Sequence, residues 1–375
     1  MKKTILYMIA FLTLAVYILA GNGRFMRFYL NDWNNDRRPL MLNWDRYKYG
    51  DLYGLSYLAG FKAPVAGDVW PRGEIVTPEE QSIDLWVIGD SFLDGRLEPE
   101  SSRSVLKHTK TRYFWWDNKD KEPKPITFDK TKHNVLLIET AERFVRDTYL
   151  SRDTVENIIG RYKTSMNDDA RPERPDIANL SPTPRKPGIF EKRLVSESFN
   201  QNLETLLFGY EFLAPIKNVK AEMNYRLFSR TAPSVAVSRD GRNLFFAETI
   251  DPGRNTSSFK PLSDAELKAI VRNINFVADT YRAKGFDEVV ISIIPNAVTV
   301  VDPGRAAYNE LIPRLQGDPE LRVPVIDVYS QMLANSDPAS LYRRSDTHWN
   351  PAGYNVWVNE ANRFMEKVAQ AGLGR

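Results

Sequence analysis

The sequence contains no cysteine and only three histidines among its 375 residues. Without cysteine the chain cannot form disulfides, cysteine-ligated zinc sites or iron–sulfur clusters, and it has no thiol nucleophile. The histidines, His108, His133 and His348, lie far apart in the sequence, so a three-histidine metal centre would need all of them together. We expect no metal ion and no cofactor, and a catalytic imidazole has only three candidates.

The net charge of the chain is also small. The chain has 51 Lys and Arg residues against 48 Asp and Glu, a net charge of +3 at pH 7. A protein built mainly to bind nucleic acid needs a basic face to match the phosphates, so we expect no nucleic-acid partner. The composition, 42% hydrophobic and 26% charged, is that of a globular protein and excludes wholesale disorder.

A long apolar run lies at the N-terminus. The stretch 4–23 carries no charge, and as a helix of about 30 Å it can span the hydrocarbon core of a bilayer. Lys2 and Lys3 precede it, so the positive-inside rule places the N-terminus in the cytoplasm and the remaining chain outside. We predict an uncleaved signal anchor, a single transmembrane helix over 1–23. Most of the +3 charge belongs to its cytoplasmic end.

A cleaved signal peptide is the alternative, and it would give a secreted protein. Signal peptidase needs small residues at positions −3 and −1. The best site, after Ala20, places Ile18 at −3, which disfavours cleavage.

Residues 24–79 form a predicted aromatic-rich juxtamembrane segment. Eleven Phe, Tyr and Trp residues lie between 22 and 70. Such rings suit packing against a folded domain and an interfacial belt near the bilayer. The alternative interpretation is that they stack on sugar rings.

Four apolar runs have the length of buried parallel strands, and they alternate with helical patterns. This alternation predicts an α/β domain over 80–375 with a central, mainly parallel sheet. Ser263 and Asn350 are expected helix caps. The predicted strands are 83–89, 134–138, 288–294 and 323–328, and the predicted helices are 139–149, 151–166, 264–284 and 351–371.

The middle of the chain breaks this alternation. Five prolines lie within 171–187 and exclude a helix there. A long amphipathic pattern follows over 192–230, and 235–248 is typical of a hairpin that turns at Asp240–Gly241. We interpret about 151–262 as a helical and hairpin insertion into the α/β domain.

One motif with catalytic potential is Gly89-Asp90-Ser91-Phe92, directly after the predicted strand 83–89. The carboxyl end of a parallel strand is where α/β sheets place reactive groups. There a serine hydroxyl is exposed, and backbone N–H groups of the following turn can stabilise an oxyanion. The alternative is a serine or aspartate that only caps a helix.

A second motif lies just before the last predicted helix, where Asp346 and His348 are separated by one residue. A serine needs a base to remove its proton, and the base needs an acidic group on its other ring nitrogen. Asp346 and His348 can supply both from one loop. The alternative is a structural Asp–His hydrogen bond. His108, in a basic polar stretch, is expected in a solvated loop, and His133 has no adjacent acid, so neither competes with His348.

The two motifs resemble those of the SGNH (GDSL-type) hydrolase superfamily, and more narrowly the AlgX/AlgJ-like branch of periplasmic polysaccharide O-acetyltransferases. The resemblance covers roughly 80–150 and 230–370. It implies a three-layer α/β fold and a triad of Ser91, His348 and Asp346. The matching stretches are Gly-Asp-Ser-Phe at 89–92 and Asp-Thr-His-Trp at 346–349, with softer matches at 136–144 and 294–296.

The chain also departs from that branch. In AlgX and AlgJ the Asp-His motif precedes the serine, whereas here it follows, as in other SGNH enzymes. No Gly-x-Asn-Asp block is present to supply the usual oxyanion asparagine. Asn296 is the candidate substitute for that asparagine, and the alternative is that it caps a loop. Arg143 is a candidate to line the cleft, and the alternative is a pair with Glu142. Trp349 is a candidate platform for a sugar ring, and the alternative is packing on the last helix.

The resemblance and the predicted anchor together indicate a membrane-anchored, extracytoplasmic serine acyltransferase. We expect it to O-acetylate a cell-envelope or exported polysaccharide through an acyl-Ser91 intermediate. The resemblance implies an acyl donor supplied by a membrane-bound acyltransferase. The alternatives are an SGNH carbohydrate esterase and a non-catalytic scaffold of the same fold in polysaccharide assembly.

Overall fold

The computed structural model describes residues 2–26, 48–65, 68–71, 73–75, 77, 80–97, 103–115, 124–159, 162–164 and 197–372. The chain divides into two compact units. Unit 1 comprises Met1–Lys48, Tyr57–Ala59 and Pro172–Arg230, and unit 2 comprises the rest. The predicted proline-rich stretch 171–187 lies outside the described residues. The predicted domain and insertion boundaries stay predictions.

Unit 2 is built on a five-stranded sheet in which every neighbouring pair is parallel. The strand order is β11-β10-β6-β2-β4. The α/β class with a mainly parallel central sheet is therefore confirmed. The strands are β2 (Ile83–Gly89), β4 (Thr109–Trp115), β6 (His133–Ala141), β10 (Glu288–Ile294) and β11 (Val325–Ile326).

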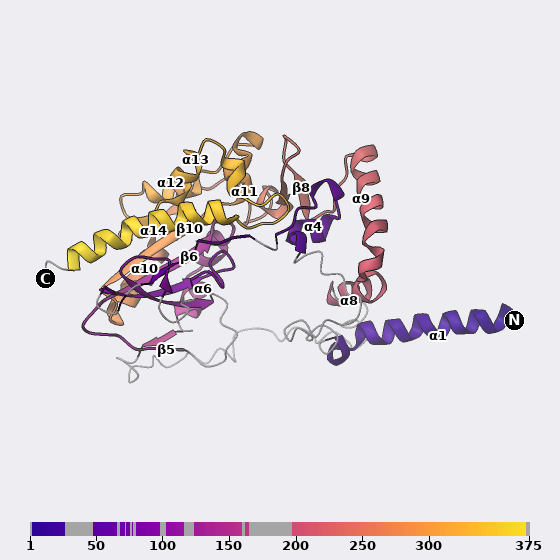
Figure 1. Cartoon of the computed structure of the whole chain (residues 1–375), viewed down its shortest axis with the longest axis horizontal. Coiled ribbons are helices and arrows are strands. Elements are labelled where there is room, and N and C mark those ends of the chain that lie inside the picture. Colours follow the sequence, from indigo (N-terminus) through magenta and orange to yellow (C-terminus); the bar gives the residue numbers. More distant parts are fainter. Residues whose placement is uncertain are drawn as a thin grey trace. The chain divides into compact units, whose positions relative to one another are not determined.

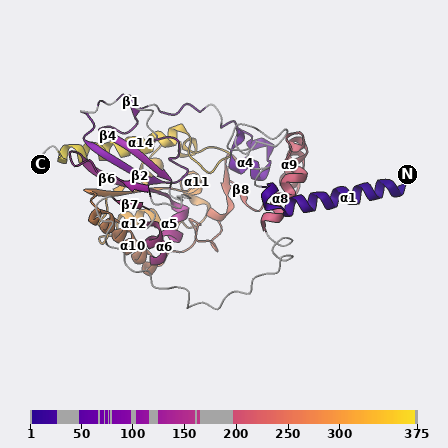
Figure 2. The same cartoon turned by 90° about the horizontal axis from the view of Figure 1, so that it is seen from below.

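Helices cover both faces of this sheet, because successive strand side chains point to opposite faces and both are apolar. Leu85 and Val87 of β2 join the core under α14 (Pro351–Gly372). Trp86 and Ile88 join the opposite core, under α5, α6 and α10. Figure 2 shows α14 on one side of the strands and these three helices on the other. The remaining helices here are α5 (Glu142–Tyr149), α6 (Arg152–Ile159), α10 (Asp264–Ala283), α11 (Ala297–Val301), α12 (Leu311–Gln316) and α13 (Val328–Leu333).

Side-chain hydrogen bonds and a glycine turn explain where two helices begin and where the hairpin turns. Ser263 accepts a hydrogen bond from the Glu266 N–H and forms a capping box at α10. Asn350 accepts from the N–H groups of two residues in the first turn of α14. The predicted hairpin is present as β8 (Val235–Val237) and β9 (Leu244–Phe246), with Gly241 at a φ of +72° in its turn. Short elements elsewhere in unit 2 are α4 (Asp51–Ser56), β1 (Glu74–Ile75), β3 (Arg103–Ser104), β5 (Lys124–Ile126) and β7 (Tyr162–Thr164).

Three predicted boundaries are wrong. Glu139 begins no helix, because β6 continues through Ala141 and pairs with β10 over these residues. The helix predicted over 151–166 ends at Ile159, and Tyr162–Thr164 pairs with β5 instead. The predicted strand 323–328 is shortened to Val325–Ile326.

The sheet also holds a strand that was not predicted. Residues 109–115 form the edge strand β4, whose first four residues are threonine or basic and whose last three are aromatic. Thr109 and Thr111 are buried, and their hydroxyls bond to each other at 2.8 Å. His108 lies in the turn before β4, at a φ of +62°, and is half-buried.

Unit 1 contains the helices α1 (Lys2–Gly21), α8 (Glu197–Phe208) and α9 (Ala214–Phe228) (Figure 1). Within the described part of the chain, α1 is the one helix long and apolar enough to cross a membrane. Such a helix near an N-terminus is either an anchor or a signal sequence. The amphipathic pattern over 192–230 is split between α8 and α9.

Candidate active site

Ser91 lies in the turn that follows β2, at the carboxyl end of the parallel sheet. Gly89 is needed there because a Cβ atom would approach the Glu139 carboxylate to 2.7 Å. The Asp90 carboxylate accepts hydrogen bonds from the N–H groups of Phe92, at 2.9 Å, and Ala141, at 3.0 Å. These bonds fix the turn to the end of β6 and so place Ser91.

The two predicted motifs meet in space. The Ser91 Oγ lies 2.7 Å from His348 Nε2, and His348 Nδ1 lies 2.6 Å from Asp346 Oδ1. These are hydrogen-bond distances, in the order nucleophile, base and orienting acid. The His348 side chain keeps 19% of its surface exposed, so the base is accessible, whereas Asp346 is buried.

Electrostatics favour an ionised Asp346. Burial by itself raises the pKa of this carboxyl, but the side-chain hydrogen bond to His348, the positive charge of that ring and backbone N–H donors together lower its pKa to about 2. An ionised acid accepts the Nδ1–H of the imidazole and leaves Nε2 free to accept the Ser91 proton. The arrangement can therefore generate a serine nucleophile.

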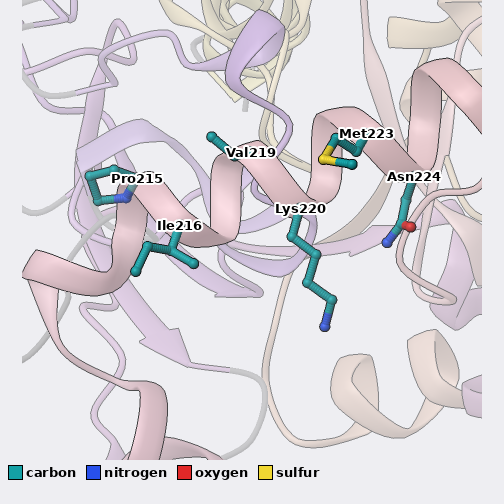
Figure 3. Close-up of a pocket in the computed structure, with 6 residues that line it drawn as sticks. All are labelled: Pro215, Ile216, Val219, Lys220, Met223 and Asn224. Carbon is teal, nitrogen blue, oxygen red and sulfur yellow. The ribbon is translucent and has the colours of Figure 1, made fainter.

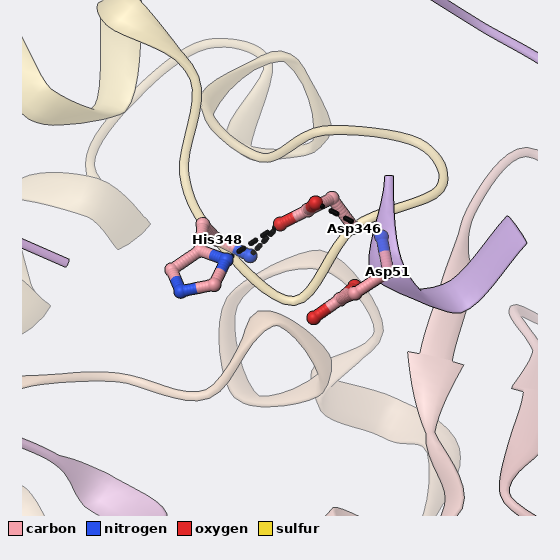
Figure 4. Close-up of side chains that lie close together, drawn as sticks. All are labelled: Asp51, Asp346 and His348. Carbon is pink, nitrogen blue, oxygen red and sulfur yellow. Dashed lines mark hydrogen bonds and ion pairs between the residues drawn. The ribbon is translucent and has the colours of Figure 1, made fainter. Parts of the chain in front are cut away.

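Asp51 is a fourth member of this site that sequence reasoning missed. Its carboxylate accepts the Thr347 N–H at 2.9 Å and the Thr347 hydroxyl at 2.6 Å, and its own N–H donates to Asp346 Oδ2 at 3.1 Å. Figure 4 shows Asp51 beside the Asp346–His348 pair. Burial, followed by the nearby Asp346 charge, raises the pKa of Asp51. Asp51 belongs to the segment that was predicted to be juxtamembrane.

The backbone around Asp51 supports the same loop. Gly50 adopts a φ of +97°, and a Cβ atom there would lie 2.3 Å from the Ser345 carbonyl oxygen. This approach lets the N–H groups of Leu52 and Tyr53 both donate to that oxygen at 3.0 Å. The Ser345 hydroxyl donates back to the Tyr49 carbonyl at 2.6 Å. The 49–53 segment thus holds the Asp346–His348 loop in position.

The side chain of Asp51 is expected to act by geometry rather than by charge. In Asp51→Asn, the amide oxygen can still accept the Thr347 N–H, and the amide nitrogen can donate to the Thr347 hydroxyl. We expect near wild-type turnover for Asp51→Asn and a loss of kcat of about 10- to 100-fold for Asp51→Ala, with KM little changed. Steady-state kinetics on an activated ester measure both values. Equal losses in the two variants would contradict a geometric role.

Phe92 brings the candidate Arg143 close to the site. The Phe92 ring packs against the His348 ring, with centroids 4.9 Å apart, and the Arg143 guanidinium lies 5.5 Å from the Phe92 centroid. Glu142 does not pair with Arg143, because its carboxylate accepts hydrogen bonds elsewhere. Among the described residues Arg143 has no carboxylate partner, and it is only half-buried. Arg96, in the same turn, donates to the Ser91 and Phe92 carbonyls, and Arg143 is a further cation beside the turn.

The other two candidates are parts of the core. Trp349 is fully buried against Phe92 and the residues of α14, so its ring offers no face to a sugar. Asn296 is also buried. Its backbone N–H donates to the Glu142 carboxylate at 2.8 Å, and its side-chain amide donates to the Ser258 hydroxyl oxygen at 2.9 Å. Burial raises the pKa of Glu142. Asn296 therefore joins a buried polar network.

The remaining histidines lie at the other end of the sheet. His108 precedes β4 and His133 begins β6, both at the amino edge, whereas Ser91 follows the carboxyl edge. Asp51, Asp346 and His348 offer oxygen and nitrogen atoms within 4.8 Å of one another, a spacing that metal sites share. The hydrogen bonds among them and Thr347 account for this cluster without a cation.

Glu139, behind the nucleophile turn, is expected to make stability depend on pH. It is fully buried and accepts the Asp90 N–H at 2.8 Å. Burial, reinforced by Asp90, raises its pKa well above the usual range. A raised folded-state pKa contributes stability below the ordinary value of 4.5, and this contribution is lost as the pH rises towards the folded-state value.

We therefore expect the free energy of unfolding of Glu139→Gln to increase relative to that of the wild type as the pH rises above 4.5. The glutamine oxygen still accepts the Asp90 N–H, so the turn is retained. Urea unfolding of both proteins between pH 5 and 8 measures the difference. Parallel pH dependences would show that Glu139 is ionised in the fold.

No protein-family model, curated protein or solved structure matches this chain. The assignment of a function therefore depends on the geometry of the site and on the chemistry of its residues.

Proposed function

We propose that the protein is a membrane-anchored, extracytoplasmic serine acyltransferase that O-acetylates a cell-envelope or exported polysaccharide. The observation that carries the proposal is the continuous pair of hydrogen bonds from Ser91 through His348 to Asp346, at 2.7 and 2.6 Å. A serine, an imidazole and a buried ionised acid in this order are the requirements of acyl-serine chemistry. The resemblance of the two motifs to AlgX/AlgJ-like enzymes supports acetyl as the acyl group.

The reaction has two halves. Ser91 Oγ bonds to the carbonyl carbon of the acyl donor while its proton passes to His348 Nε2, and the leaving group departs with that proton. A sugar hydroxyl then bonds to the same carbon, gives its proton to His348, and the carbon–Oγ bond breaks. Ser91 recovers its proton from His348. Asp346 stabilises the imidazolium in both halves.

The negative charge that develops on the carbonyl oxygen of the acyl donor must be stabilised by hydrogen-bond donors. The Ser91 N–H has no acceptor among the described residues and is available to the oxyanion. Arg143, beside Phe92 and without a carboxylate partner in the described part of the chain, is the second donor that we propose. Such donors lower the activation barrier most when they point at the position where the oxyanion develops.

Hydrolysis is the competing outcome of the same intermediate, and it would make the protein an esterase. The apolar helix α1, as an anchor with the sheet outside the cytoplasm, favours transfer to a polymer at the envelope. A scaffold that only retains the fold has no need for a Ser91–His348 hydrogen bond. We expect the acyl donor to come from a membrane-bound acyltransferase.

The proposal is tested with the full chain in detergent, an activated acetyl ester and an oligosaccharide acceptor. We expect an adduct 42 Da heavier on the peptide that contains Ser91, the mass of an acetyl group replacing hydrogen, and acetylated oligosaccharide by mass spectrometry. Free acetate with no acetylated acceptor would favour the esterase. The absence of both the adduct and turnover would favour the scaffold.

A further inference from the structure

The helix α9 in unit 1 turns its apolar side outward. Side chains that face the protein are small or polar, among them Lys217, Asn218 and Glu222, which are half-buried. A helix that packs on a soluble domain shows the opposite arrangement. The outward stripe consists of Ile216, Val219, Met223 and Leu227, which are 65%, 61%, 54% and 66% exposed.

This stripe, which we call the α9 apolar face, is continuous along the helix. Its members recur every three or four residues, so they lie on one side. Figure 3 shows Ile216, Val219 and Met223 around a shallow hollow on this side, with Lys220 extending from its edge. Leu207 and Phe208, at the end of α8, and Phe212, just before α9, are exposed as well. Monomeric soluble proteins rarely leave so large a patch uncovered.

The connection of α9 to α1 indicates what covers this face. The start of α8 packs on the C-terminal end of α1, where the Phe199 and Tyr17 rings lie 5.7 Å apart and the Asn202 amide donates to the Ala20 carbonyl at 3.0 Å. After α8 ends at Phe208, five residues, 209–213, lead into α9. The chain therefore enters α9 close to the end at which α1 leaves a bilayer.

The direction and charge of α9 agree with a membrane surface. Within unit 1, α9 lies crosswise to α1 in both views (Figures 1 and 2), as a helix in the membrane plane lies to a spanning helix. The helix carries Lys217, Lys220 and Arg226 against one acid, Glu222. Lys217 lies over the Tyr57 ring and Arg226 pairs with Glu222, whereas Lys220 lies at the edge of the stripe. Lys220 can therefore reach a lipid phosphate while the stripe enters the acyl region.

We propose that the α9 apolar face lies in the headgroup–acyl boundary of the bilayer that α1 enters. The protein then has two membrane elements, one spanning and one in the plane. This proposal depends on α1 remaining attached, and it is independent of the chemistry at Ser91. A second copy of the chain or a protein partner on the same face is an alternative that the experiment separates.

The lack of cysteine allows a direct test. Full-length Val219→Cys and Met223→Cys, each labelled with an environment-sensitive fluorophore, are reconstituted into vesicles of phosphatidylcholine and phosphatidylglycerol. We expect quenching by doxyl-labelled lipid to exceed quenching by aqueous iodide by about twofold or more at both positions. Leu12→Cys, in the middle of α1, reports insertion of the anchor, and Asp251→Cys, exposed in unit 2, should respond only to iodide.

The inference is overturned if Leu12→Cys is quenched by lipid while both α9 labels respond only to iodide. Disulfide formation between two Val219→Cys copies in the vesicles would assign the face to a second copy instead. Two labelled positions guard against a local effect of one substitution. Circular dichroism of the labelled proteins checks that each has folded. Ester turnover is measured separately, so failure of the acyltransferase proposal would be distinguished from failure of this one.

Discussion

Replacing Ser91 with alanine is expected to lower acyl turnover by about 10³- to 10⁶-fold and to leave the fold intact. The change removes the oxygen that lies 2.7 Å from His348 Nε2, and no cysteine can replace it as nucleophile. Ser91 makes no side-chain hydrogen bond within the described residues apart from that to His348, so its loss should hardly affect stability. Turnover of p-nitrophenyl acetate and the Tm measure the two effects.

Ser336→Ala is the matched control, because Ser336 is exposed and lies outside the site. It should turn over the ester like the wild type. Undiminished activity in Ser91→Ala would remove Ser91 from the mechanism and with it the proposed acyl-enzyme. A large fall in Tm would instead make the loss of activity a folding defect.

Asp346→Asn is expected to lower kcat by about 10³- to 10⁴-fold. The amide nitrogen donates where the carboxylate accepted, so the imidazole turns to the tautomer that carries hydrogen on Nε2. That nitrogen can no longer accept the Ser91 proton, and the imidazolium loses its counter-charge. KM should change little, because Asp346 is buried. A change confined to KM would contradict this role.

The pH dependence of stability provides a second test of the ionised state of Asp346. Its pKa is lowered from 3.8 to about 2, so its contribution to stability is complete above about pH 4 and is lost as the pH falls through 2. Asp346→Asn should therefore be less stable than the wild type at neutral pH, and the gap should narrow between pH 4 and 2. Acid-induced unfolding followed by circular dichroism measures the gap.

The sequence predicted the parts of the site that depend on local pattern. An apolar strand followed by Gly89, and an Asp-x-His spacing before a capped helix, are visible within a few residues, and these place Ser91, Asp346 and His348. The strands β2 and β10 were predicted over their observed lengths because both of their faces are buried and apolar.

What the sequence could not reveal depends on distant contacts. Asp51 is 295 residues from Asp346, and nothing next to it indicates a catalytic role. Glu139 was assigned to a helix because a charged residue rarely lies in a buried strand, yet it is held there by Asp90. The edge strand β4 begins with buried threonines whose hydroxyls bond to each other, and its aromatic part, Tyr113–Trp115, is too short to predict a strand.

The 49–53 segment determines where the chain should be truncated to obtain a fragment without α1. A truncation after the aromatic stretch, at residue 80, would keep every strand of the five-stranded sheet and all three triad residues. It would also remove the Asp51 and Leu52 N–H groups that bond to Asp346 and Ser345. Such a fragment is expected to fold and yet position its histidine poorly, so a lack of activity in it would say nothing about the intact protein. A start before Tyr49 avoids that error.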